Sequence, residues 1–209
     1  MRILLFYVCL MLGANVFSQQ LKLVPPGYYR RDTVYVMDGY RYRCDGTKGM
    51  VMLYNADYTN LWEEKKQVYK ETGKVFDFGF GDIKKYNPIL EDISMNQKVL
   101  DIVDNAFTKD FVSCLKGHEN ITVTLFLDSE TGRVEEVSFW FVPSSAFAFL
   151  PISVYREIEL QLINEVSYTP SSIGKQLNYI MLSLKRKPLG KSSSSSSSSS
   201  SGLLPKPQG

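Results

Sequence analysis

The residues that could carry chemistry in this sequence are a cysteine and a histidine four positions apart. Cys114 and His118 are close enough on a helix for their side chains to meet, and an imidazole beside a thiol lowers the thiol pKa. A nucleophilic pair of this kind also needs a residue that orients the imidazole. Gly117 is expected to end the helix between them, and the sequence offers no identifiable orienting residue. We therefore interpret Cys114 as buried or disulfide-bonded and His118 as a loop residue at the surface.

The sequence does not support a metal site or an acid–base site any better than it supports the cysteine–histidine pair. His118 is the single histidine and two cysteines remain outside the N-terminal segment, so these residues cannot assemble the four ligands of a zinc site. Acidic residues on solvated faces give the same sequence pattern as the paired acids of a glycosidase. The sequence thus predicts no metal, no cofactor and no enzymatic activity. The acidic pairs in question are Glu135 with Glu136, Glu157 with Glu159, and Asp101 with Asp104.

Residues 1–18 have the layout of a secretory signal peptide. Met1 and Arg2 supply a positive start, residues 3–12 form an apolar run, and residues 16–18 suit a cleavage site. A run of about ten apolar residues is too short to cross a hydrocarbon core as a helix. We expect an exported protein in the periplasm, at the cell surface or in the medium, with no transmembrane span after cleavage.

The net charge bears on whether the protein binds nucleic acid, and the cysteine content on whether it forms a disulfide. The formal net charge is +2, from 24 Lys and Arg against 22 Asp and Glu, and Arg2 leaves with the signal peptide. A nearly neutral chain has no electrostatic basis for binding nucleic acid. Cys44 and Cys114 remain once the N-terminal segment is removed, and an oxidising compartment permits a disulfide between them. Two separate buried thiols are the alternative that the sequence leaves open.

An N-terminal unit, residues 19–92, is predicted to contain a small β-meander with a helix. Residues 33–54 alternate as strands do, and Asp38-Gly39 suits a type I′ turn, which needs positive φ at both central positions. A capping-box pattern predicts a helix over residues 60–72, with Gly73 as its C-terminal stop.

A second unit, residues 93–188, is predicted to be an α+β domain. A bulge is expected near Glu135, because Val134 falls out of phase with the strand that follows. Residues 189–209 include an uninterrupted serine run and are predicted to be a disordered tail. The expected elements of the unit are a helical segment over 93–115, a hairpin of residues 121–127 and 137–141, a long helix over 152–167 and a strand over 179–184.

Three motifs follow one another in this second unit. An alternating strand over 122–128 leads through a turn with Gly132 into a second alternating strand. The long helix closes with Tyr168-Thr169-Pro170, and a last strand follows over 178–184. Residues 110–187 thereby resemble the carboxy-terminal domain of TonB, the energy-transducing protein of outer-membrane uptake. The resemblance implies the order helix, hairpin, helix, strand, and a sheet edge that accepts an extended segment of another protein.

The chain also departs from the TonB pattern. It has neither the uncleaved membrane helix nor the long proline-rich spacer, and Asp110-Phe111 stands where the family has Tyr-Pro. Coupling to an inner-membrane motor is therefore not expected. The resemblance implies instead a short secreted protein of a Bacteroidetes-type uncharacterised family.

The sequence leads to one functional expectation and two alternatives. We expect a non-catalytic module that binds a protein of the cell envelope. The alternatives are an envelope hydrolase whose carboxylates are not identified and a structural or adhesin-associated accessory protein. The predicted binding edge consists of Tyr179, Ile180, Met181 and Leu182.

Overall fold

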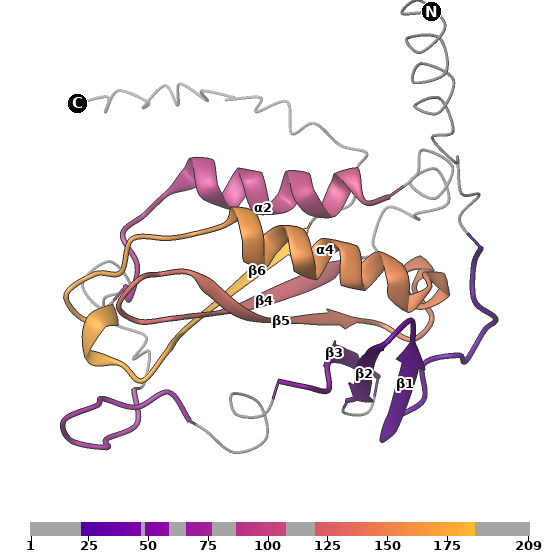
Figure 1. The fold of residues 1–209 in the computed structure, drawn as a ribbon, viewed down its shortest axis with the longest axis horizontal. Helices are drawn as coiled ribbons and strands as arrows, with labels where there is room; N and C mark the ends of the chain where they lie inside the picture. The colour runs from indigo at the N-terminus through magenta and orange to yellow at the C-terminus, as the bar shows by residue number, and fades with distance from the viewer. Residues whose placement is uncertain (1–21, 47–48, 59–65, 77–86, 108–119, 187–209) are drawn as a thin grey trace, which may run out of the picture.

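The described part of the chain forms one antiparallel sheet with two α-helices on one face (Figure 1). The computed structural model describes residues 22–46, 49–58, 66–76, 87–107 and 120–186. The helices are α2 (Ile93–Asn105) and α4 (Ile152–Glu165), with short 3-10 helices η1 (Ala146–Phe149) and η2 (Gly174–Gln176). The strands are β1 (Thr33–Met37), β2 (Tyr40–Asp45), β3 (Val51–Asn55), β4 (Ile121–Leu127), β5 (Val134–Phe141) and β6 (Ile180–Arg186). The predicted α+β class is confirmed.

The N-terminal meander forms as its turn residues predict. Asp38 and Gly39 have φ values of 46° and 80°, the left-handed conformation that a type I′ turn requires at both positions. Met37 and Tyr40 close the hairpin, and β2 then pairs antiparallel with β3.

The two predicted units meet in a single sheet. β3 pairs antiparallel with β5, so the strand order is β1-β2-β3-β5-β4-β6. The register between β4 and β5 shifts at the predicted bulge, because Phe126 faces Glu136 whereas Leu127 faces Val134. Glu135 is the extra residue.

The core lies between this sheet and the helices. The predicted long helix is α4, whose apolar side is buried, and its Tyr155 ring packs against two aromatic residues of β5. Its centroid lies 5.0 Å from that of Phe139 and 5.5 Å from that of Phe141. The Tyr155 hydroxyl donates to Phe147 O at 2.7 Å, so its polar atom is satisfied inside the core.

The predicted helix over residues 60–72 is wrong for its described part. Residues 66–72 form a bridge and a turn, while residues 59–65 lie outside the described chain. Tyr69 N donates to Lys74 O at 2.9 Å and Lys70 N donates to Gln176 O at 2.8 Å. These main-chain groups are therefore used by pairing with other segments, which overrides the local capping signals.

The other helical and terminal predictions are met in part. Over residues 93–115 the structure describes α2, which begins at the N-cap Asp92, whose side chain accepts from Met95 N at 2.9 Å. Residues 108–119, the predicted signal peptide over 1–18 and the tail predicted over 189–209 lie outside the described residues. Neither described α-helix is long and apolar enough to cross a membrane.

The turn between β4 and β5 is pressed against the segment that follows α4. Gly132 has φ +71°, and its N–H donates to Asp128 O at 2.8 Å. Tyr168 N donates to Gly132 O at 3.0 Å, and a Cβ at residue 132 would lie 1.7 Å from Tyr168 O. Two motifs that the sequence places 36 positions apart are thus in direct contact.

We expect the substitution Gly132→Ala to lower the free energy of unfolding by about 2–4 kcal/mol, because it adds a steric overlap to left-handed strain. Gly73→Ala is the matched control, since Gly73 has φ +64° but open space around its Cβ position. The control should cost about 1 kcal/mol in urea unfolding. Equal losses in the two variants would contradict the contact.

Candidate functional site

The predicted acidic pairs do not converge on a common cavity within the described residues. Glu135 is exposed at the bulge while Glu136 is half-buried beside it. Glu157 is exposed on α4, whereas Glu159 is fully buried. On α2, Asp101 faces solvent, and the remaining member, Asp104, binds an arginine of β6.

Glu159 is the centre of a buried polar cluster that joins α4 to the meander. Its carboxylate accepts hydrogen bonds from the hydroxyls of Tyr42 on β2 and Tyr58, which follows β3. Arg156 Nη1 donates to the same carboxylate at 2.6 Å, and the Arg156 guanidinium lies 5.7 Å from the centroid of the Tyr40 ring. Burial, followed by the negative charge of Glu159, raises the pKa values of both Tyr42 and Tyr58.

This cluster has the properties of a structural anchor. Three donors satisfy the carboxylate, and its own partners exclude it from solvent. A general acid or base must reach a substrate proton, which a fully enclosed carboxylate cannot do in this arrangement. The sequence holds a signal for the cluster, because Glu159 lies four residues after Tyr155 and three before Leu162, which is the spacing of the buried face of the helix.

A second buried ion pair fixes the end of β6. Arg186 is 2% exposed, and its Nε donates to Asp104 Oδ1 on α2. Its guanidinium also lies 5.8 Å from the centroid of the Phe107 ring. This contact ties the last described strand to the C-terminal end of α2.

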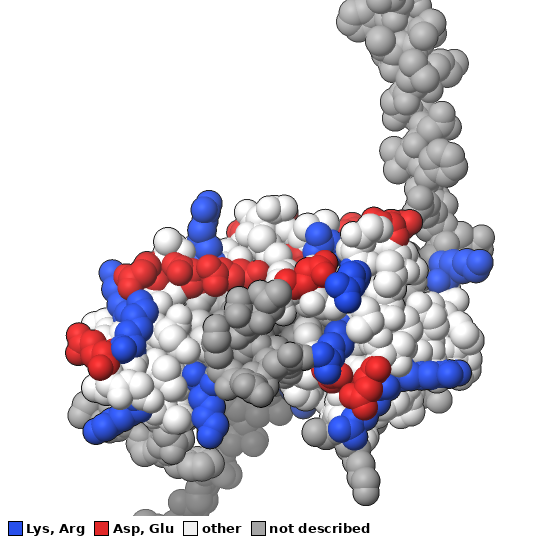
Figure 2. Space-filling view, turned by 60° about the horizontal axis from the view of Figure 1, so that its bottom comes forward, with Lys and Arg blue, Asp and Glu red and all other residues white. Residues whose placement is uncertain are grey.

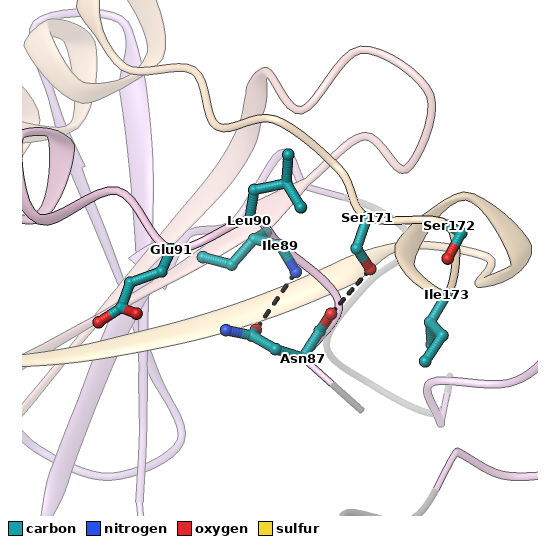
Figure 3. A pocket seen from close by; sticks show the side chains of 7 residues that line it. All are labelled: Asn87, Ile89, Leu90, Glu91, Ser171, Ser172 and Ile173. Atoms are coloured by element: carbon teal, nitrogen blue, oxygen red, sulfur yellow. Dashed lines mark hydrogen bonds between the residues drawn. The ribbon is translucent and has the colours of Figure 1, made fainter. Parts of the chain in front are cut away.

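A surface pocket of about 300 Å³ lies between the segment before α2 and the segment after α4 (Figure 3). Its polar groups largely hold the two segments together: Ser171 Oγ donates to Asn87 O at 2.7 Å, and Asn87 Oδ1 accepts from Ile89 N. Glu91 is the one titratable residue in the described lining. The pocket therefore lacks an acid–base pair among the residues that line it.

Cys44 lies in the core on β2. Burial, with smaller contributions from Asp45 and Asp32, raises the pKa of its thiol to about 12. Cys114 and His118 lie outside the described residues. The Cys44–Cys114 disulfide therefore stays a prediction.

Three of the four predicted binding residues lie on β6 at the border of the sheet, whereas Tyr179 precedes the strand, and the side chains of Tyr179 and Ile180 are buried. β6 is the last strand in the order, and all seven of its residues pair with β4 on one side. Leu182 and Leu184 are half-buried on the helix face, whereas the alternate residues Met181, Ser183 and Lys185 are exposed on the other face. No described strand lies on the outer side of β6.

The direction of the main-chain groups of β6 follows from alternation along the strands. Asp128 N donates to Arg133 O at 2.9 Å, so even-numbered residues of β4 face β5 and odd-numbered ones face β6. Leu182 and Leu184 lie opposite odd-numbered residues of β4 and exchange hydrogen bonds with them. The N–H and C=O groups of the three alternate residues, Met181, Ser183 and Lys185, therefore point outward.

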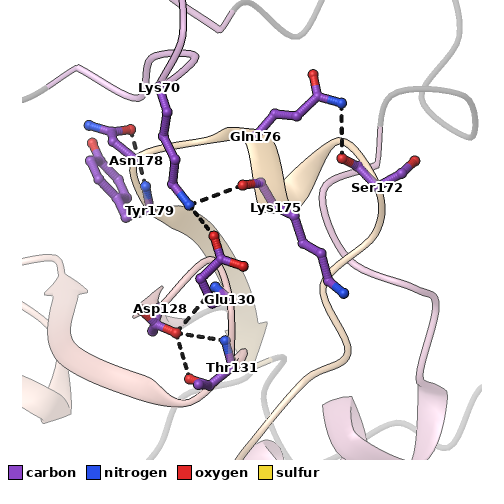
Figure 4. Close-up of polar contacts among 9 residues, drawn as sticks. All are labelled: Lys70, Asp128, Glu130, Thr131, Ser172, Lys175, Gln176, Asn178 and Tyr179. Atoms are coloured by element: carbon purple, nitrogen blue, oxygen red, sulfur yellow. Dashed lines mark hydrogen bonds and ion pairs between the residues drawn. The ribbon is translucent and has the colours of Figure 1, made fainter.

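Another segment of the chain forms an isolated antiparallel bridge with the residues that precede β6. Asn178 N donates to Val68 O at 3.0 Å, and Lys70 N donates to Gln176 O, so residues 68–70 pair antiparallel with residues 176–178. Lys70 Nζ reinforces this pairing by contacting Glu130 at 2.5 Å and Lys175 O at 3.0 Å (Figure 4). The chain just before β6 thus pairs with an antiparallel segment, and the edge is left open from Ile180 onward by the described residues.

Charge is mixed on the face of the molecule that Figure 2 presents. Acidic side chains form a band across the view, and basic side chains lie around it without gathering into one patch. The opposite border of the sheet, β1, exposes Val34 by 43% and Val36 by 73%. Single-sign electrostatic attraction is therefore a poor basis for recognition on this face, and main-chain pairing at the borders is the available alternative.

Comparisons with known proteins point to one family. The model described as "Domain of unknown function (DUF5043)" matches residues 26–184. Among solved structures, this chain is similar to that of a DUF5043 family protein from Bacteroides uniformis ATCC 8492, with 39% sequence identity and a TM-score of 0.68. That match covers 78% of this chain and 95% of the other. No curated protein matches the chain. The resemblance to TonB is not confirmed by these comparisons.

The anchor at Glu159 predicts a large and local loss of stability. We expect Glu159→Gln to lower the free energy of unfolding by about 2–4 kcal/mol. The substitution removes the negative charge to which three groups donate hydrogen bonds, and it leaves Arg156 without its ion-pair partner. The part of Arg156 that reaches solvent keeps this below the full cost of a stranded buried charge. Glu157→Gln, on the exposed face of α4, is the control and should change stability by less than about 0.5 kcal/mol in urea unfolding. A neutral result for Glu159→Gln would rule the anchor out.

The raised pKa of Cys44 predicts an unreactive thiol in the folded protein. At pH 8 the thiolate fraction should be about a thousandfold below that of an unperturbed thiol, so iodoacetamide should label Cys44 only after unfolding. Mass spectrometry of the labelled peptide, with and without urea and reductant, measures this. Rapid labelling of the native protein would contradict the burial, and labelling that requires reductant as well as urea would reveal the predicted disulfide.

Proposed function

We propose that this chain, which belongs to the DUF5043 family, is an exported, non-catalytic module that binds a protein of the cell envelope by strand addition at β6. The observation that carries the proposal is the outward row of main-chain groups on β6. An edge strand that is already paired on one side offers a template for a further strand, and main-chain hydrogen bonds supply the affinity.

The arrangement of the C-terminal elements supports this reading. The order α2, β4, β5, α4 and β6 is the order helix, hairpin, helix, strand that the resemblance to the TonB carboxy-terminal domain implies. Antiparallel pairing also occurs just before this strand, where residues 68–70 bond to residues 176–178. Export rests on the signal-peptide pattern of residues 1–18 and stays a prediction.

Competing chemistry has less support from the described residues. The buried carboxylate Glu159 is enclosed by its partners, and the lining of the described pocket contains one acidic residue, Glu91. Paired acids facing a common cleft would favour a hydrolase. Among the described residues, the outward main-chain groups of β6 form a regular row that a partner strand could pair with.

A proline at an outward-facing position tests the proposal. Ser183→Pro removes an outward N–H and should not remove a hydrogen bond to β4, because edge strands tolerate proline where the N–H faces away from the sheet. A random-peptide display library selected on the purified protein should yield sequences that bind the native chain and lose at least about tenfold in affinity, about 1.4 kcal/mol, on this variant.

Ser183→Ala is the matched control. It removes the contact of Ser183 Oγ with Thr124 Oγ1 at 2.9 Å, as the proline variant does, but it keeps the outward N–H. Peptides should therefore bind this variant like the native chain, and circular dichroism should show that both variants are folded. Selection that enriches nothing on the native chain, or enriches peptides that bind the folded proline variant equally well, would refute strand addition at β6.

A further inference from the structure

The edge of β6 carries enough asymmetry to define the kind of segment it accepts. This inference rests on the proposed function. It concerns the length and the side-chain pattern of the partner segment that would pair with β6, which we call the guest. Three features determine both: a stop at one end of the edge, a different chemistry on each face of β6, and a single exposed charge.

The length of the guest is limited by the chain itself. Residues 68–70 occupy the border beside residues 176–178, immediately before β6 begins. Gln67 Nε2 also donates to Tyr179 O at 3.0 Å, which carries the occupied part up to the first residue of the strand. A guest can therefore pair along Ile180–Arg186 and meets the segment of residues 67–70 if it extends further in that direction.

The helix face beside the edge is apolar. Leu182 and Leu184 point to the face that carries α2 and α4, where they pack against the core and remain half-exposed. α2 contacts β6 on this side, and the Arg186–Asp104 ion pair holds the two together. A guest residue on this face would lie next to a leucine, so apolar side chains would cover surface that is now partly in water.

The other face of the edge is polar and carries one positive charge. Ser183 and Lys185 are exposed there, beside Met181, which is 44% exposed. No described acidic residue forms an ion pair with Lys185. An acidic guest residue opposite Lys185 would therefore gain a cross-strand charge pair, whereas a basic residue there would be repelled.

We propose that the partner of this protein presents an extended segment of about six or seven residues, with apolar side chains at alternate positions and polar side chains between them, including an acid opposite Lys185. The guest lies on the outer side of β6 and places its apolar side chains on the face of α2.

Two synthetic heptapeptides of equal composition test the pattern. One alternates valine with glutamate and threonine, and the other has its valines in one block and its polar residues in another. We expect the alternating peptide to bind the full chain at least about tenfold more tightly than the blocked peptide, as measured by isothermal titration. Chemical shifts of backbone amides should change along residues 180–186 rather than along β1.

Charge reversal tests the position of the acid. Lys185→Glu should weaken binding of the glutamate peptide and favour an otherwise identical peptide that carries lysine. Lys74→Glu is the control, because Lys74 is an exposed lysine outside β6, and it should leave the preference unchanged.

The outcomes separate this inference from the proposed function. Equal binding of the two peptides, abolished for both by Ser183→Pro, would overturn the pattern and leave strand addition at β6 standing. An unchanged preference in Lys185→Glu would overturn the acidic position. Absence of binding by either peptide at millimolar concentration, binding that survives Ser183→Pro, or shifts that map to β1 would overturn both proposals.

Discussion

The packing of α4 on the centre of the sheet is the contact on which the other features depend. Tyr155 inserts its ring between Phe139 and Phe141, and the remaining buried residues of the helix extend this contact over β5 and its neighbours. Burial of this apolar surface is the main favourable term for a sheet that carries helices on one face. It also places Glu159 against β2, so this buried cluster adds to the β3–β5 pairing that joins the hairpin to the meander.

The sheet has two border strands, β1 and β6, and their surroundings differ. The six strands form an open sheet with β1 and β6 outermost, so each of these two strands pairs with a described strand on one side alone. Residues 68–70 pair with the chain just before β6, and Arg186 and Asp104 fix the far end of the strand. The strand is thus supported at both ends, and no described segment pairs with its outer side between them. A rigid edge of this kind costs a guest less entropy than one that must first become ordered.

Local patterns predicted the local structure well and long-range pairing poorly. Asp38-Gly39 and the phase shift at Glu135 each specify a conformation through the residues themselves, and each is confirmed, as is the long helix expected over 152–167, which is α4. Nothing in β3 indicates that β5 is its partner, because pairing between distant strands depends on the whole fold. The helix predicted over 60–72 is wrong from residue 66 onward for the same reason, since hydrogen bonds to residues 74 and 176 compete with the local signal. Glu159 and Arg186 were not predicted to be buried because they are charged, although Glu159 has the helical spacing of Tyr155 and Leu162 and Arg186 alternates with Leu182 and Leu184.

The distribution of satisfied polar groups indicates how recognition can work here. The buried charges of Glu159 and Arg186 are engaged by partners within the fold, so they contribute to stability rather than to contact with other molecules. In the described pocket, the Ser171 hydroxyl bonds one segment to the other, and the Asn87 amide oxygen accepts from Ile89 N within its own segment. The main-chain N–H and C=O groups of alternate residues of β6 face outward in a regular row and can form hydrogen bonds. Recognition through such an array selects the extended conformation first, and only the side chains on its two faces, Leu182 and Leu184 against Ser183 and Lys185, can then select a sequence.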